Sequence, residues 1–349
     1  MPADHILTFA QGLSGGGVER AQLRLAREWL AAGRRVTLAI GDTRGPLAAD
    51  LPPGLTIEPL GDDRYRTQHR IRGIVRRLRP DLIFCAGNHY TLVAAWIRLR
   101  LGADCPPIVG KMSNAADRGD HNALTGLAHR LWLAQHGRFL DHLVAMTPAT
   151  AAQAARLTRM ERRTSVIPNP PARVEDGAAT TILPTGRVIL GVGRLVPQKR
   201  WDRLIAALPA LPADVRVVIL GEGELRKPLE RQIADAGLTD RIHLRGHVAD
   251  PLAAMAQASL LALVSDYEGV PGVLREALSV GTPVVATACS PSVREIVAFP
   301  ALGSVVAPDD AAGLAAALTH WLDAPRPAPV PQPGADSAAR YLRLFDALT

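Results

Sequence analysis

Short apolar runs alternate with stretches of helical spacing along the chain, and this alternation restricts the fold more than any other sequence feature. The runs His5–Ala10 and Arg35–Ile40 enclose residues 18–32, whose apolar side chains recur at helical spacing. Strands that alternate with helices form parallel sheets, because each crossover helix packs on a face of the sheet. The sequence therefore predicts an α/β fold, with further strands expected at 81–86, 107–110, 142–146 and 165–167.

A second series of the same kind begins near residue 188, with strands expected at 188–192, 216–220, 242–245, 260–264 and 283–286. Between the two series lies Val166-Ile-Pro-Asn-Pro-Pro171, whose prolines exclude helix and interior strand. The chain has 349 residues, enough for two hydrophobic cores. We therefore expect two Rossmann-like parallel-sheet domains that face a cleft, at residues 1–170 and 171–324.

The last part of the chain, 325–349, is expected to form a spacer and a returning helix. Prolines occupy every second position from Pro325 to Pro333, which favours an extended polyproline segment. Beyond them, apolar side chains fall on one helical face and need a surface to cover, which predicts that the helix docks on one of the domains. These side chains are Tyr341, Leu344, Phe345 and Leu348.

Composition excludes several classes of protein. Apolar residues make up 48% and charged residues 21% of the chain, so neither a disordered nor a fibrous protein fits. The three cysteines are widely scattered and form no CxxC pair, which excludes a zinc knuckle and indicates a reducing compartment. No uncharged apolar run reaches the roughly 18 residues of a membrane span, and the N-terminus lacks a signal-peptide pattern. We expect a cytoplasmic protein.

A glycine-rich loop, Gly12-Leu-Ser-Gly-Gly-Gly-Val-Glu-Arg20, lies between the first expected strand and its helix. Glycines let the backbone approach a ligand closely, and the helix N-terminus offers free N–H groups and a partial positive charge. A dinucleotide site would need a third glycine, where the chain has Arg20, and an acid near the end of the second strand, where it has Asp42. The loop alone fits either a phosphate site or a simple tight turn.

A second glycine loop follows the first strand of the second series and carries Gly193, Arg194 and Lys199. Open α/β sheets bind ligands at the carboxyl ends of their strands, and an arginine fork with a lysine charge suits a diphosphate. Only 3 of the 40 basic residues are lysines, so a lysine at 199 favours a positional requirement over a solvated surface role. The strand end at Arg245 could bind a nucleotide base through its backbone.

Two carboxylates, Glu268 and Glu276, lie eight residues apart, the first in a loop after a buried strand and the second in the following helix. A carboxylate accepts hydrogen bonds from sugar hydroxyls, which suits Glu276 to a ribose and Glu268 to a hexose. The alternative is that either acid only complements the helix dipole. The backbone at the start of this helix could bind a phosphate through Gly269, Val270, Gly272 and Val273.

Three of these segments together resemble the retaining nucleotide-sugar glycosyltransferases of family 4, which have the GT-B fold. They are GGGVER at 15–20, GRLVPQK at 193–199 and EGVPGVLREALSVGTPVVAT at 268–287. The similarity runs over nearly the whole chain and includes VIPNP at the linker. It implies a hexose transfer from a nucleoside diphosphate sugar to an acceptor hydroxyl, with retention, in the synthesis of a cell-envelope polysaccharide or lipid-linked glycan.

The resemblance also implies roles for individual residues. Arg194 and Lys199 would contact the donor diphosphate, Glu268 the transferred sugar and Glu276 the ribose. Gly15 and Gly16 would lie near the phosphates and the acceptor. Many members have a histidine in the loop after the strand at 107–110, where this chain has Lys111-Met-Ser-Asn114. The acceptor-side candidates are therefore Lys111, Asn114 and His89.

Catalysis would depend on stabilising the leaving diphosphate, so no protein nucleophile is expected, and no cofactor beyond the donor. No metal is expected, because Asp62-Asp63 is an isolated loop pair rather than an Asp-x-Asp pair at a strand end. One alternative is a dinucleotide-dependent oxidoreductase, which leaves Arg194, Lys199 and the two glutamates unexplained. The other is a nucleic-acid-binding protein, against which stands an aromatic content of only 4%.

Positive charge is concentrated in the N-terminal half. Residues 1–170 hold 23 basic and 14 acidic residues, and seven arginines lie between Arg64 and Arg79. An apolar stripe, Ile71 to Leu78, runs between these arginines, and a second amphipathic stretch, 124–140, adds Trp132 and Phe139. Such helices suit anionic lipid, so we expect a lipid-linked acceptor and peripheral binding to the inner face of the cytoplasmic membrane. The alternative is ordinary packing on the sheet with solvated arginines.

Overall fold

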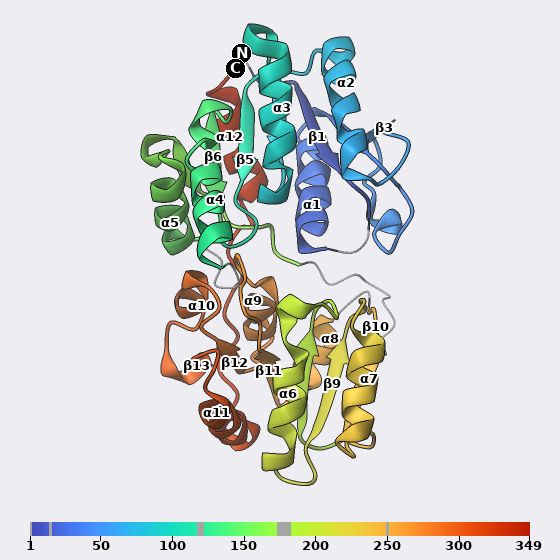
Figure 1. Ribbon diagram of the computed structural model, residues 1–349, viewed down its shortest axis with the longest axis vertical. Coiled ribbons are helices and arrows are strands. Elements are labelled where there is room, and N and C mark those ends of the chain that lie inside the picture. The colour runs from blue at the N-terminus through green and yellow to red at the C-terminus, as the bar shows by residue number, and fades with distance from the viewer. Residues whose placement is uncertain (1, 14–15, 117–121, 173–182, 249–250) are drawn as a thin grey trace. The chain divides into compact units, whose positions relative to one another are not determined.

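The computed structural model describes residues 2–13, 16–116, 122–172, 183–248 and 251–349. It divides into two compact units. The N-terminal unit comprises Met1–Pro170 and Pro333–Thr349, and the C-terminal unit comprises Pro171–Gln332. Each unit is a parallel sheet with helices on both faces (Figure 1).

In the N-terminal unit, the described strands form a seven-stranded sheet in the order β3-β2-β1-β4-β5-β6-β7. Helices α2 to α5 cover one face of this sheet, and α1 and α12 cover the other (Figure 1). The strands are β1 (His5–Ala10), β2 (Arg35–Ile40), β3 (Thr56–Pro59), β4 (Leu82–Cys85), β5 (Ile108–Lys111), β6 (His142–Ala145) and β7 (Thr164–Val166). The helices are α1 (Gly17–Ala31), α2 (Ile71–Leu78), α3 (Thr91–Leu101), α4 (Ala123–Leu133), α5 (Pro148–Thr158) and α12 (Ser337–Asp346).

In the C-terminal unit, the described strands form a six-stranded sheet in the order β10-β9-β8-β11-β12-β13. Helices α6, α7 and α11 pack on one face, and α8, α9 and α10 pack on the other. The strands are β8 (Val188–Val192), β9 (Arg216–Leu220), β10 (Ile242–Gly246), β11 (Leu260–Leu263), β12 (Val284–Thr287) and β13 (Gly303–Val306). The helices are α6 (Trp201–Ala207), α7 (Arg226–Asp235), α8 (Leu252–Gln257), α9 (Gly272–Ser279), α10 (Pro291–Ile296) and α11 (Ala311–Asp323).

The predicted α/β fold with two Rossmann-like sheets is confirmed, and the structure adds two edge strands, β3 and β13. Central strands such as β1 and β4 are buried at every position, which gives the continuous apolar runs seen in the sequence. The edge strands are only partly buried, and β3 reads Thr-Ile-Glu-Pro. Because they lack an apolar run, the sequence did not reveal them.

The last helix docks on the N-terminal unit. Tyr341 and Phe345 of α12 are fully buried and make edge-on ring contacts with Trp29 of α1 at 5.9 and 5.2 Å between centroids. The Trp29 indole donates a hydrogen bond to the carbonyl of Ala338 at 3.3 Å. The proline-containing residues before α12 are divided between the units, since 325–332 belong to the C-terminal unit. Among them, Val330 donates its N–H to the carbonyl of Leu278 at 2.9 Å.

Each sheet has one place where a ligand crevice is expected. In both units the first three strands are added in order toward one edge of the sheet, and the fourth strand pairs with the other side of the first. The strand order therefore reverses between β1 and β4 and between β8 and β11. Open α/β sheets bind ligands beyond the carboxyl ends of the two strands at such a switch point. The candidate site residues can therefore be judged by their distance from these two points.

Candidate active site

Two of the predicted catalytic residues meet at the switch point of the C-terminal sheet. Lys199 lies in the loop after β8, and Glu268 lies in the loop after the neighbouring strand β11. Lys199 Nζ is 2.6 Å from Glu268 Oε1, and Ser265 Oγ donates a hydrogen bond to the same oxygen at 2.8 Å. The Lys199 and Glu268 side chains are 15% and 12% exposed, so the ion pair is mostly shielded from water.

Glycines allow this crowding of the strand ends. Gly193 has φ +156°, and a Cβ there would lie 3.1 Å from Cε of Lys199. Gly221, after β9, has φ +150°, and a Cβ there would collide with the carbonyl oxygen of Gly193. Side chains at these two positions would therefore strain the backbone and displace Lys199.

Arg194 is fixed at its backbone rather than at its guanidinium. Its carbonyl accepts a hydrogen bond from the indole of the buried Trp201 at 3.0 Å. The residue itself is exposed and precedes Lys199 by five positions in the sequence. The Arg194 side chain therefore extends from the same loop as Lys199, and the hydrogen bond from Trp201 holds the backbone of Arg194 in place.

The start of α9 lies directly after Glu268. The helix begins at Gly272, directly after Pro271. Gly272 is exposed, and a Cβ there would lie 3.9 Å from Oε1 of Glu276. The Glu276 carboxylate therefore lies along the first turn of α9, beside Gly272. The backbone of Gly269, Val270, Gly272 and Val273 leads into and forms the start of this helix.

Two serines that the sequence analysis did not single out hold this loop in place. Ser290 Oγ and Ser292 Oγ, after β12, both donate hydrogen bonds to the carbonyl of Gly269, at 2.5 and 2.9 Å. The N–H of Glu268 donates to the carbonyl of Cys289 at 3.1 Å. Ser290 also caps α10, a role that its position before Pro291 could have indicated. Their contact with Gly269 has no sequence signal.

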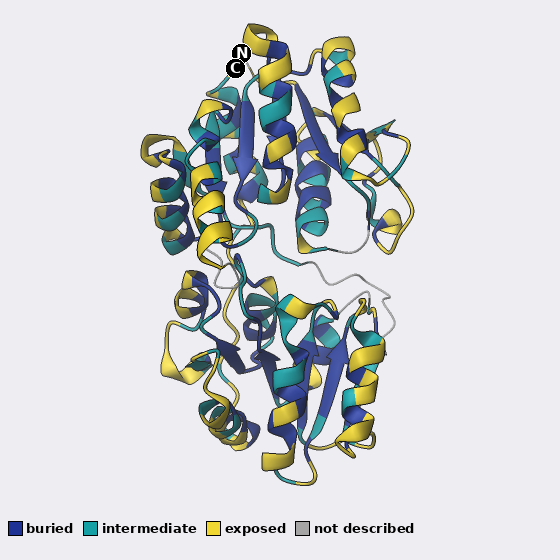
Figure 2. Ribbon diagram, in the orientation of Figure 1, coloured by how far each residue is buried: buried dark blue, intermediate teal, exposed yellow. Residues whose placement is uncertain are grey.

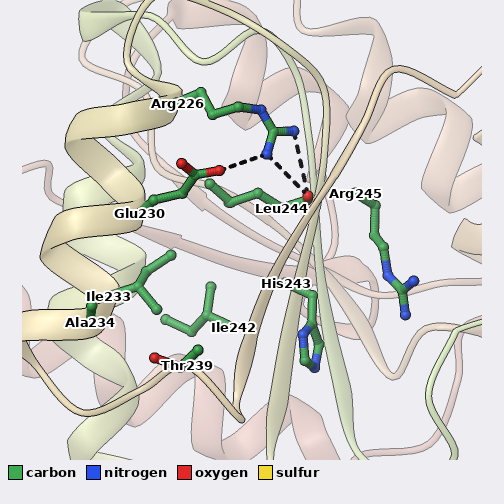
Figure 3. Close-up of a pocket in the computed structure, with 9 residues that line it drawn as sticks. All are labelled: Arg226, Glu230, Ile233, Ala234, Thr239, Ile242, His243, Leu244 and Arg245. Atoms are coloured by element: carbon green, nitrogen blue, oxygen red, sulfur yellow. Dashed lines mark hydrogen bonds and ion pairs between the residues drawn. The ribbon is translucent and has the colours of Figure 1, made fainter.

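Arg245 lies apart from this group. It is near the end of β10, the edge strand, which is separated from β8 by β9. A pocket of about 430 Å³ lies between β10 and α7, where Arg226 donates to Glu230 at 3.0 Å and to the carbonyl of Leu244 at 3.4 Å. Arg245 extends away from α7 (Figure 3). The structure therefore does not bring Arg245 into contact with the Lys199–Glu268 pair, and its role at a base stays a prediction.

In the N-terminal unit, Gly16 and His89 lie at the switch point between β1 and β4. Gly16 precedes α1, and a Cβ there would collide with the carboxylate of Glu19 in the first turn of the helix. His89 is exposed in the turn after β4. Gly15 falls outside the described residues.

Hydrogen bonds join the loops after β4 and β5, at the carboxyl ends of these two strands. The side-chain oxygen of Asn88 accepts hydrogen bonds from Ser113 Oγ and from the N–H of Asn114, both at 3.0 Å. Asn114 and His89 are thereby placed on neighbouring loops, next to the glycine loop after β1. Asn88 was missed because asparagine in a turn is common and carries no specific signal.

Lys111 is buried, whereas the sequence placed it in an acceptor-facing loop. It is the last residue of β5, is 2% exposed, and donates a hydrogen bond from Nζ to Oδ1 of Asn169 at 2.5 Å. Burial lowers the pKa of Lys111 to about 7. In this structure the side chain joins the end of β5 to Asn169, in the segment after β7. Asp42, the acid that a dinucleotide site would need, forms an ion pair with Arg44 at 2.8 Å.

The arginine-rich helix α2 uses its apolar stripe for the core. Ile71, Ile74 and Val75 are buried against the sheet, while Arg76 and Arg77 are exposed. The expectation that this stripe faces lipid is therefore wrong, because the sheet already covers it. None of the helices that the structure describes has the length and apolar character to cross a bilayer.

Comparisons with known proteins agree with this architecture. Residues 15–170 match the family model described as Glycosyltransferase Family 4, and residues 175–331 match Glycosyl transferases group 1. The lipopolysaccharide 1,6-galactosyltransferase of Escherichia coli is 25% identical over 263 residues, which cover 74% of this chain and 70% of the relative.

Another relative, from Campylobacter jejuni, is 35% identical over 124 residues, which cover 36% of this chain and 34% of the relative. It is an N-acetylgalactosaminyltransferase that acts on a diphospho-undecaprenol-linked saccharide. This chain spans about a third or less of the length of three of the curated relatives that it matches.

Among solved structures, Anabaena HepE in complex with UDP and glucose superposes with a TM-score of 0.73 at 21% identity, over 99% of this chain and 95% of HepE. That likeness establishes the two-domain fold. The two family models match one unit each and leave only the ends of the chain and residues 171–174 unmatched. The chain therefore belongs to the glycosyltransferases with the GT-B fold.

Proposed function

We propose that this chain transfers a hexose from a nucleoside diphosphate sugar to an acceptor hydroxyl with retention at the anomeric carbon. The observation that carries the proposal is the Lys199–Glu268 ion pair of 2.6 Å beside the N-terminus of α9. An ammonium suits a diphosphate and a carboxylate suits sugar hydroxyls, so the pair matches both parts of a nucleotide sugar. The UDP-glucose bound to the structural relative HepE supports this class of donor.

The proposed chemistry needs charge compensation more than proton transfer. As the bond between the anomeric carbon and the diphosphate oxygen breaks, the electron pair leaves with the diphosphate. Lys199, Arg194 and the N–H groups at the start of α9 would stabilise that negative charge, and Glu268 would orient the sugar. The acceptor oxygen then bonds to the anomeric carbon on the same face and gives its proton to an oxygen of the departing diphosphate. We propose that the reaction uses no protein nucleophile, metal or cofactor.

The N-terminal unit is the proposed acceptor site. Gly16, His89 and Asn114 lie on loops at the carboxyl ends of neighbouring strands of its sheet, where a saccharide could bind. The relatives named for lipopolysaccharide and for an undecaprenol-linked saccharide support a saccharide or lipid-linked saccharide of the cell envelope as acceptor. We further propose that the protein acts in the cytoplasm, on the inner face of an anionic membrane, and not on nucleic acid.

Thermal-shift titration with UDP-, GDP- and ADP-sugars tests the donor class. A specific donor at 100 times its Kd should stabilise the protein by about 2.7 kcal/mol. NMR of the products formed with and without excess EDTA then tests the chemistry, and we expect the donor's anomeric configuration to be retained in both. A strict requirement for Mg²⁺ or Mn²⁺, an inverted product, or stabilisation by NAD alone would contradict the proposal.

A further inference from the structure

Helix α4 carries a row of exposed leucines. Leu124, Leu127 and Leu131 are 80%, 58% and 59% exposed, and we call them the α4 leucine stripe. Positions spaced by three and four residues lie on one side of a helix, so the three side chains form a continuous row. Figure 2 shows α4 exposed along most of its length. Single exposed leucines need no explanation, but an apolar row on one helix indicates a binding surface.

The helix is held in place without this stripe. At its C-terminal end Leu133 is buried, and Trp132 stacks on the buried Phe139 with ring centroids 5.5 Å apart. At its start, the side chain of Asn122 accepts a hydrogen bond from the N–H of Thr125 at 2.9 Å. The stripe therefore contributes little to folding and is available to a partner.

The segment of the chain that includes the stripe is rich in basic residues. Residues 64–140, which build α2, α3 and α4, contain 13 basic and 4 acidic residues. The net charge of this region, 13 basic minus 4 acidic residues, is therefore larger than the net charge of the whole chain, which is +7. Arg66, Arg76 and Arg138 are exposed. Helices α2 to α4 cover the same face of the N-terminal sheet, so Arg76 of α2 and the leucines of α4 belong to helices on one face of that unit (Figure 1).

We propose that the α4 leucine stripe inserts into the interfacial region of an anionic phospholipid bilayer, while exposed arginines of the same unit, such as Arg138 in the turn after α4, bind lipid phosphates. An apolar row on a helix, together with cations on the same unit, matches the requirements of interfacial binding. The inference rests on the proposed function in placing the protein at a membrane. It assigns the contact with the membrane to the apolar stripe of α4 rather than to that of α2.

A second copy of the chain is a poorer occupant. Pairing of two such faces would bring two groups of exposed arginines together, and their repulsion opposes association. A stable protein interface buries about 800 Å² on each partner, whereas an 11-residue helix with three exposed leucines offers a narrow row. An anionic bilayer supplies both the apolar layer and the opposite charge.

Vesicle co-sedimentation of the full chain tests the proposal. Vesicles of phosphatidylcholine alone are compared with vesicles containing phosphatidylglycerol, at low and high salt. We expect at least about tenfold stronger binding to the anionic vesicles, and a loss of about tenfold in the double variant Leu127→Ser/Leu131→Ser. The matched control is Phe299→Ser, which removes an apolar side chain that is 68% exposed in the C-terminal unit and should leave binding unchanged.

A labelled variant gives a second, independent readout. Cys85, Cys105 and Cys289 are all buried, so a single exposed cysteine can be labelled selectively. A polarity-sensitive dye on Leu127→Cys should shift to the blue when phosphatidylglycerol vesicles are added, and the same dye on Phe299→Cys should not. This measurement decides the question even if the double serine variant does not fold.

Several results would overturn the assignment. Equal binding to both vesicle types, undiminished binding of the double variant, or no dye shift at Leu127 would each do so. A concentration-dependent dimer broken by Leu127→Ser/Leu131→Ser, without vesicle binding, would assign the stripe to a second copy. Hydrolysis of the donor sugar without vesicles should be unaffected by the double variant. If the unmodified protein does not hydrolyse the donor sugar, that result would instead count against the proposed function.

Discussion

The carboxylate of Glu268 accepts hydrogen bonds from Lys199 and Ser265, and the shorter one comes from Lys199, whose ammonium lies 2.6 Å from the carboxylate. The two residues are separated by 69 positions in the sequence and belong to the loops after two neighbouring strands. A donor diphosphate would compete with Glu268 for the same ammonium. In the proposed reaction, the ion pair would hold Lys199 where the negative charge of the leaving group develops.

Lys199→Met should lower kcat/KM by about 100-fold or more, on the order of 2.7 kcal/mol, because the diphosphate would lose a cation in the transition state. Arg194→Ala should have an effect of the same order. The matched control is Lys227→Met on α7, an exposed lysine of the same unit, which should keep full activity. Steady-state kinetics with a soluble acceptor measure all three. Turnover near that of the unmodified protein in both site variants would contradict the assignment.

Glu276→Ala should raise the donor KM about tenfold or more with a smaller change in kcat, because a ribose contact is alike in the ground and transition states. A donor analogue with 2′-deoxyribose gives a sharper test. It should bind the unmodified protein more weakly than the natural donor, yet bind Glu276→Ala as tightly as that variant binds the natural donor. Glu161→Ala, an exposed acid of the N-terminal unit, is the control. A fall in kcat with the donor KM unchanged would show that the carboxylate has another role.

Ser290 and Ser292 share one acceptor, the carbonyl of Gly269, so either serine can partly replace the other. Each single alanine variant should therefore lose no more than about 1 kcal/mol of stability, and the double variant should lose more than the sum. The double variant should also raise the donor KM, because Gly269 joins Glu268 to the start of α9. Denaturant unfolding and kinetics measure both effects.

Thr319→Ala removes a hydroxyl–carbonyl hydrogen bond of 2.9 Å on α11 and is the matched control for stability. Additive losses at the two serines, with an unchanged donor KM, would show that they do not act together in holding the Gly269 loop.

The fold could be read from the sequence because the central strands are buried on both faces. β1, β2, β8 and β9 begin and end where the apolar runs do. The edge strands β3 and β13 were missed because a half-buried strand needs no apolar run. The order of the strands was not predicted. It places β1 beside β4 and β8 beside β11, which brings the loop residues of each site together.

The finer parts of the site could not be read in this way. The chain indicated Lys199 and Glu268 by residue type and position, but their ion pair depends on the register of β8 against β11. Nothing local marks Ser265 as a donor to Glu268. Helical spacing also describes α2 and α4 equally well, and only the structure shows that the sheet covers the stripe of α2 and leaves that of α4 exposed.

The burial of Lys111 predicts an unusual dependence of stability on pH. Its pKa is lowered to about 7 in the folded protein, against about 10.4 in an unfolded chain. Between these values the unfolded state binds a proton that the folded state has released, so the free energy of unfolding rises with pH. Over pH 7 to 9 this group alone should add about 2 kcal/mol.

Lys111→Met should be more stable than the unmodified protein at pH 7, and its free energy of unfolding should lack that rise, because methionine fills the site without a charge to desolvate. Urea unfolding of both proteins at pH 7, 8 and 9 measures the difference. Lys227→Met, at an exposed lysine, is the control and should follow the unmodified protein at every pH. Parallel pH profiles for Lys111→Met and the unmodified protein would mean that Lys111 remains charged, held by Asn169 and by the nearby carboxylate of Glu19.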